Sequence, residues 1–250
     1  MTDAVMLLVG ALYLGVGVLA AILVPLALLA SGPRWRRGDQ VLPFGAAVVL
    51  AAWFAVANTL VTSGGLQRGL GPVPAIAFVL LIPLALGLGL VLGVQRLRST
   101  FLSRELQPLL IAMQAYRIAG VGFLALVAVG QLPAVFGIPA GAGDVLVGAT
   151  ALGAAAAVRR GQVMSGVWWN VTGLLDLVIA VTLGIGTGPS VLHFIPATPT
   201  SSLLTAAPFA VVPAFIVPLD IWLHCVSLWA LTTRRANATV TARLSAASAA

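Results

Sequence analysis

The residues of this chain that could do chemistry are few, and they gather in its second half. Arg117, Asp144, Asp176 and Asp220 lie inside long apolar segments, and His224 follows Asp220 by four residues. An arginine or aspartate at the centre of a lipid bilayer costs about 2.5–3.5 kcal/mol even on a lenient scale. These groups must therefore face one another, water or a ligand. Together they could bind protons, a cation or a polar small molecule.

The spacing of the four charges predicts that they lie at one depth. Each is 13 to 15 residues from a polar residue at the arginine-rich end of its segment: Arg117 from Arg104, Asp144 from Arg159, Asp176 from Gln162 and Asp220 from Arg234. At about 1.5 Å per residue, all four lie about 20–22 Å from that end. We therefore expect four helices to share one polar layer in the outer third of the membrane.

Neighbouring polar residues are expected to extend this layer. Gln114 precedes Arg117 by three residues and Thr172 precedes Asp176 by four, which places each on the same helical face as its charge. Three carboxylates against one guanidinium favour proton or cation binding, because repulsion between like charges favours protonation of at least one acid. The alternative is an Arg–Asp pair that only locks helices together, with the other acids protonated and hydrogen-bonded.

Helix-breaking residues stand beside two of the acids: Gly141 and Gly143 before Asp144, and Pro213 and Pro218 before Asp220. Interrupted helices next to intramembrane acids are typical of binding sites in transporters. The loop 186–202 contains His193, Phe194 and three prolines, and it is apolar enough to form an outer lid over the layer. Two histidines and one cysteine are too few for most metal or haem sites, so we expect no metal and no cofactor.

Composition places the chain in a membrane. Of its 250 residues, 60% are hydrophobic and 8% are charged, with a mean hydropathy of +1.11. A soluble fold of this size cannot bury so much apolar surface. The 13 basic residues are all arginine, which excludes a lysine Schiff base and the lysine of a phosphate-binding loop. No catalytic motif is present, so an enzyme is not expected.

Seven apolar segments predict an all-α, polytopic membrane protein with a seven-transmembrane-helix bundle: residues 4–30, 41–62, 73–94, 106–130, 144–158, 163–185 and 211–231. They form one domain over residues 1–235, and the small, polar segment 236–250 is expected to be a disordered cytoplasmic tail. The fifth segment is short for a span. We expect it to complete its crossing with residues 131–143, as a broken or re-entrant piece.

The arginines predict the orientation of the bundle. With seven spans, 11 of the 13 fall on one side, whereas Arg68 falls on the other and Arg117 lies within a span. Arginine-rich ends stay in the cytoplasm, so the N-terminus is expected outside and the C-terminus inside. The net charge of +7 follows from this distribution and does not indicate a nucleic-acid partner.

Three stretches of the charged half resemble a family of uncharacterised bacterial multi-pass integral membrane proteins: "GQLPAVFGIPAGAGDVLVGATA", "WNVTGLLDLVIAVTLG" and "PAFIVPLDIWLHCVSL". The resemblance covers about residues 114–228. It implies a multi-pass protein of the bacterial cytoplasmic (inner) membrane. It implies no activity and no substrate.

These features suggest a proton- or cation-coupled small-molecule transporter. Asp176 and Asp220 would carry the proton or cation, Arg117 would be the counter-charge, and Asp144 would lie near the mouth of the site. The alternative is a protein that does not transport, either an outward-facing ligand sensor or an accessory subunit. In that case the first three segments would offer a small-residue face to another copy of the chain or to a membrane-complex partner.

Overall fold

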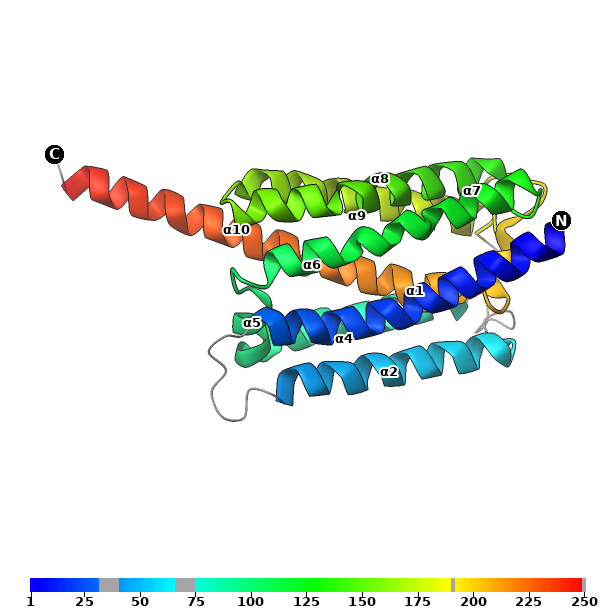
Figure 1. Ribbon diagram of the computed structural model, residues 1–250, viewed down its shortest axis with the longest axis horizontal. Coiled ribbons are helices and arrows are strands. Elements are labelled where there is room, and N and C mark those ends of the chain that lie inside the picture. Colours follow the sequence, from blue (N-terminus) through cyan, green and yellow to red (C-terminus); the bar gives the residue numbers. More distant parts are fainter. Residues whose placement is uncertain (32–40, 66–74, 190–191, 249–250) are drawn as a thin grey trace.

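The computed structural model of the chain describes residues 1–31, 41–65, 75–189 and 192–248. Within these ranges the backbone forms helices, turns and loops without a strand, as the all-α prediction requires. The long helices lie side by side, and the two termini lie at opposite ends of the bundle (Figure 1). Helices suit these apolar segments because each satisfies its own backbone hydrogen bonds without water.

The helices of the first half are α1 (Thr2–Ser31), α2 (Val41–Thr62), α4 (Ala75–Gly93) and α5 (Gln95–Phe101). The second half contains α6 (Gln107–Met113), the 3₁₀ segment η1 (Gln114–Gly120), α7 (Val121–Ala128), α8 (Ala134–Arg159), α9 (Val163–Gly186), the 3₁₀ turn η2 (Ser201–Thr205), the π-helical segment η3 (Val212–Ile216) and α10 (Val217–Ser248). Segments α6, η1 and α7 follow one another as a single long rod, 107–128.

The number of candidate spans among the described residues is six, or seven if one bent pair counts as a span. This pair is α4 and α5, which meet near Val94 at an angle of 100°. The third predicted segment, 73–94, coincides with α4, although residues 73 and 74 lie outside the described residues. The other six segments are each long and apolar enough to cross a membrane by themselves: 2–31, 41–62, 107–128, 134–159, 163–186 and 212–233.

Two expectations about helix limits differ from the structure. Helix α8 is continuous for 26 residues, so residues 134–143 do extend the short fifth segment as expected, whereas the predicted break or re-entrant turn was wrong. Gly141 and Gly143 lie in its interior. They do not break the helix, because glycine weakens a helix by only about 1 kcal/mol and keeps its backbone N–H. Helix α10 continues to Ser248, whereas a disordered tail was expected for residues 236–250.

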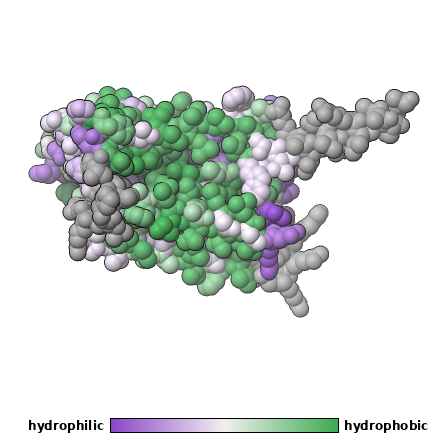
Figure 2. Space-filling view, turned by 180° about the vertical axis from the view of Figure 1, so that it is seen from behind, coloured by the Kyte–Doolittle hydropathy of each residue, from purple (hydrophilic) through white to green (hydrophobic). Residues whose placement is uncertain are grey.

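Helix α10 is the centre of the bundle. Within the span 212–233, 67% of its 18-residue apolar window is buried, against 17% of the corresponding window in α2. Helix α10 packs against α9 and α4, and α8 packs against α9 and the α6–η1–α7 rod. The helices that carry the predicted charges therefore form one packed unit, with α1 and α2 at its side. Figure 2 shows a broad hydrophobic belt between more polar ends, as expected for a protein surrounded by lipid.

The contact between α8 and η1 depends on glycine. A Cβ atom at Gly148 would lie 2.5 Å from the backbone nitrogen of Ile118, and one at Gly141 would lie 2.8 Å from the carbonyl oxygen of Gly120. Both neighbours are backbone atoms that cannot swing away. Small residues bring membrane helices this close together, and here they bring α8 within reach of the side chains of η1.

We predict that Gly148→Ala destabilises the protein by about 1–3 kcal/mol, because the added methyl group forces α8 away from η1. Gly153→Ala in the same helix is the matched control, since a Cβ atom there meets nothing within 4 Å. Thermal unfolding of the two variants in detergent micelles measures the difference. Equal melting temperatures for both variants would contradict this packing.

Candidate binding site around Arg117

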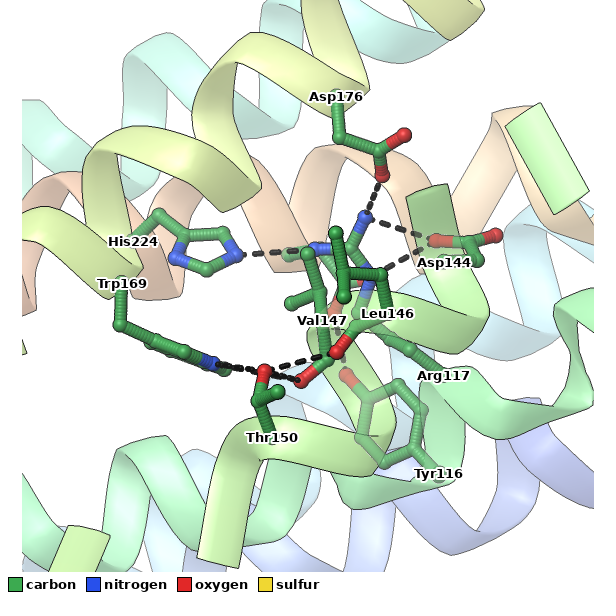
Figure 3. Close-up of polar contacts among 10 residues, drawn as sticks. Tyr116, Arg117, Asp144, Leu146, Val147, Thr150, Trp169, Asp176 and His224 are labelled. Carbon is green, nitrogen blue, oxygen red and sulfur yellow. Dashed lines mark hydrogen bonds and ion pairs between the residues drawn. The ribbon is translucent and has the colours of Figure 1, made fainter. Parts of the chain in front are cut away.

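The site is built around the guanidinium group of Arg117, whose side chain is 1% exposed. Its Nε and Nη2 atoms each lie 2.7 Å from Oδ1 of Asp144. Nη2 also forms a short ion pair with Oδ2 of Asp176, and Nε lies 3.9 Å from Oδ2 of Asp220. Figure 3 shows the carboxylates of Asp144 and Asp176 converging on the guanidinium. One arginine of η1 thus contacts acids from α8, α9 and α10.

The imidazole of His224 completes the shell, and its tautomer follows from its neighbours. Nη1 of Arg117 lies 2.9 Å from Nε2 of His224 (Figure 3). Arginine can only donate, so Nε2 accepts and carries no proton. Nδ1 then donates to Oδ1 of Asn170 at 2.9 Å, and Nδ2 of Asn170 donates to Oγ of Ser227 at 3.1 Å. His224 is therefore neutral in this arrangement, with its proton on Nδ1.

Two aromatic residues support the shell. The Tyr116 hydroxyl donates a short hydrogen bond to Oδ1 of Asp220. The Trp169 ring packs on the His224 ring, with 5.0 Å between the centroids, and its indole N–H donates to Oγ1 of Thr150 at 3.1 Å. These contacts hold both the acid and the imidazole of α10 in place.

Glycines make the space for this shell. A Cβ atom at Gly143 would collide with the Asp176 carboxylate, and one at Gly173 would collide with the His224 ring. Gly143 therefore has a steric role in the site, in a helix that is not broken. Any larger residue at either position would displace a group that contacts Arg117.

A cavity of about 1020 Å³ reaches this cluster from one side. Tyr116, Arg117, Asp144 and Asp220 line its polar end, whereas Asp176 is not among its lining residues. It extends past α9 to Gly130 and to the segment 199–206, which includes η2, at the end of the bundle where α7 and α9 end. Two of the three acids therefore face a space large enough for a small molecule.

Four predicted site residues lie outside the cluster. Thr172 is exposed on α9, and no hydrogen bond links it to the cluster. Gln114 is buried, but neither its side-chain oxygen nor its nitrogen has a hydrogen-bond partner among the described residues. His193 and Phe194 are exposed and do not line the cavity, so they do not form the expected lid. Other residues of the same loop do line the cavity, namely Gly188, Pro189 and residues 199–202, and residues 203–206 continue this lining.

The helices are irregular at two places in the site. Arg117 lies in the 3₁₀ segment η1, and the π-helical segment η3 ends four residues before Asp220. Pro213 and Pro218 lie within and just after η3, where the sequence predicted an interrupted helix. Short 3₁₀ and π segments inside long helices often mark functional positions. No glycine or proline precedes Arg117 within η1, so the sequence does not predict the 3₁₀ geometry there.

A family model described as a domain of unknown function, DUF8737, matches residues 73–232. The chain belongs to this family. The matched region runs from the start of α4 into α10 and contains every member of the Arg117 cluster. No curated protein and no solved structure matches the chain. Within the described residues, no group of three or more His, Cys, Asp or Glu side chains could hold a metal ion.

We predict that Arg117→Met destabilises the protein by about 3–5 kcal/mol, because it leaves buried carboxylates without their counter-charge. Adding Asp176→Asn in the same chain should recover part of this loss, since it removes one of the stranded charges. Arg98→Met, at an exposed position of α5, is the control and should change stability by less than about 0.5 kcal/mol. Unfolding in detergent measures all three; similar losses for Arg117→Met and Arg98→Met would refute the role of Arg117.

Proposed function

We propose that this protein is a small-molecule transporter of the bacterial cytoplasmic membrane, coupled to protons or cations through the Arg117 cluster. The observation that carries the proposal is the cavity that reaches the carboxylates of Asp144 and Asp220 inside an apolar bundle. Ionisable groups at this depth are expensive to keep, and in membrane proteins they mark substrate or ion pathways. The cavity gives these two acids a route to solvent.

The charge of the cluster suits this role. Three carboxylates surround one guanidinium and a neutral imidazole, which leaves an excess of negative charge if all the acids are ionised. A proton or a cation from the cavity would reduce this excess. Asp144 and Asp220 are therefore the proposed carriers, and Asp176, which does not line the cavity, is a partner of Arg117.

The irregular segments provide places where the site can change shape. Conversion of a 3₁₀ segment to regular α-helix changes the twist by about 20° per residue, so it rotates and shifts the residues that follow it. Such a change in η1, or a similar one in η3, would move Arg117 or Asp220 relative to the other helices. Transporters use interrupted helices in this way, beside a site near the middle of the membrane.

The alternative is a ligand sensor or an accessory subunit, and one observation favours it. Arg117 ties η1 to α8, α9 and α10 at once, and Asn170, His224 and Ser227 fill the space behind it without any exposed surface. Alternating access would have to break several of these contacts. A sensor could bind its ligand in the cavity and leave them intact.

We predict the orientation from the arginines: the end that carries Arg159 and Arg160 faces the cytoplasm, and the N-terminus lies outside. A green fluorescent protein fused to the C-terminus should therefore fluoresce in bacterial cells, whereas alkaline phosphatase fused there should be inactive. The reverse pair of results would overturn the topology. Equal expression of both fusions is the control.

For transport, we predict that proteoliposomes loaded with a pH indicator show solute-dependent proton flux. Asp144→Asn and Asp220→Asn should reduce this flux at least about tenfold, because each removes a carboxylate that faces the cavity. Asp3→Asn, which removes an exposed acid near the start of α1, is the matched control and should retain it. Folded protein without flux under proton, sodium or solute gradients would favour the sensor or subunit.

A further inference from the structure

The cavity also indicates what kind of molecule it receives. We propose that it binds an organic ammonium ion with an aromatic or other apolar body, with the positive charge at Asp144 and the body along the wall formed by Tyr13, Phe123 and Phe136. This inference rests on the proposed function in treating the cavity as a ligand site. It does not require that the ligand be transported.

Asp144 is the acid best placed to meet a cation. Its side chain is 21% exposed, against 9% for Asp176 and 2% for Asp220. Both contacts from Arg117 fall on Oδ1, and no described residue donates a hydrogen bond to Oδ2. Asp144 thus keeps one free carboxylate oxygen at the polar end of the cavity, in a cluster with excess negative charge. A positive group is the complementary ligand.

The wall next to this end is aromatic. The rings of Tyr13 and Phe123 have centroids 5.2 Å apart, and those of Phe123 and Phe136 are 5.5 Å apart. All three residues line the cavity. Aromatic faces attract ammonium groups, and cages of aromatic residues are the usual recognition of quaternary ammonium ligands. The same faces pack well against an aromatic ligand body.

Tyr13 adds a specific polar group. Its side chain is 3% exposed and lines the cavity, and its hydroxyl has no hydrogen-bond partner among the described residues. A buried hydroxyl without a hydrogen-bond partner is unfavourable, because it has lost its bonds to water. An acceptor on the ligand, such as an ether or carbonyl oxygen, would supply the missing hydrogen bond. The ligand therefore combines a cation, an apolar body and an acceptor oxygen.

The size of the cavity argues against a bare inorganic cation as the ligand. Its volume of about 1020 Å³ is that of a site for a drug-sized molecule, and most of its wall is apolar. Leu177, Val212 and Ile216 are among the apolar residues that line it. A metal ion alone would leave these side chains in contact with water, whereas an organic cation would cover them.

The test is calorimetric titration of the full chain in detergent with three matched probes. The cation is 2-phenoxyethyl-trimethylammonium, the neutral isostere is 3,3-dimethylbutyl phenyl ether, and the anion is 4-phenoxybutanoate. We expect the cation to bind at least about tenfold more tightly than the isostere, and the anion not to bind. Equal binding of cation and isostere, tighter binding of the anion, or binding of sodium ions alone would overturn the proposal.

Variants locate the site. Asp144→Asn should weaken cation binding at least about tenfold, and Tyr13→Phe, which keeps the ring, should weaken it about two- to tenfold. Asp3→Asn is the control, because it removes the same charge at an exposed acid near the start of α1 that lies outside the cluster and does not line the cavity. Its effect should be less than about threefold. Equal losses for the two aspartate variants, or no loss for Tyr13→Phe, would refute the placement.

The outcomes separate this inference from transport. Binding of the cation without any flux in proteoliposomes would leave the ligand class intact and refute the transporter. Proton flux with another solute, in protein that binds none of the three probes, would support the transporter and refute the ligand class.

Discussion

A guanidinium group buried among three carboxylates and an imidazole is the constraint on which this structure depends. Each charged group left alone among apolar helices would cost several kcal/mol, which is a large share of the stability of a domain. They must therefore meet, and the helices must approach closely enough for them to meet. The glycines between α8, α9, α10 and η1 provide that approach. Packing and charge pairing in this half of the bundle are thus a single requirement.

The cluster has two sides with different surroundings. On one side, His224, Asn170 and Ser227 form a hydrogen-bonded chain without solvent exposure, which orients the imidazole toward Arg117. On the other side, Asp144 and Asp220 border the cavity. The buried side has the properties of a structural lock, and the open side has those of a binding site. Under the proposed function, the structural and functional interpretations of the charges therefore apply to different members of one cluster.

The shared depth of the charges could be predicted from the sequence because the rise of a helix per residue is constant. Whether a given residue points to the interior of the bundle or to its surface was harder to predict. Thr172, four residues before Asp176, is rotated by only about 40° from it. Asp176 lies at the edge of the buried surface, so this rotation exposes Thr172, whereas Gly173 faces inward against His224.

Other features left no signal that could be read from one chain. The continuity of α8 depends on hydrogen bonds that glycine retains, and the 3₁₀ geometry of η1 arises where the rod packs against α8. No pattern in the sequence indicates that the Trp169 ring packs on His224. The cavity depends on how side chains from distant segments fill space, which no periodicity encodes. The spacing of Ser227, three residues after His224, could have suggested that both lie on one face.

The residues that line the cavity come from two parts of the chain, one inside the region that the family model matches and one before it. Every group of the Arg117 cluster lies within residues 73–232, whereas Tyr13 and Val16 come from α1, which precedes the matched region. A chain that shared only the matched region would keep the same acids and lack this side of the pocket. Under the proposed function, the acids that hold the charge and part of the wall that selects the ligand therefore come from different parts of the chain.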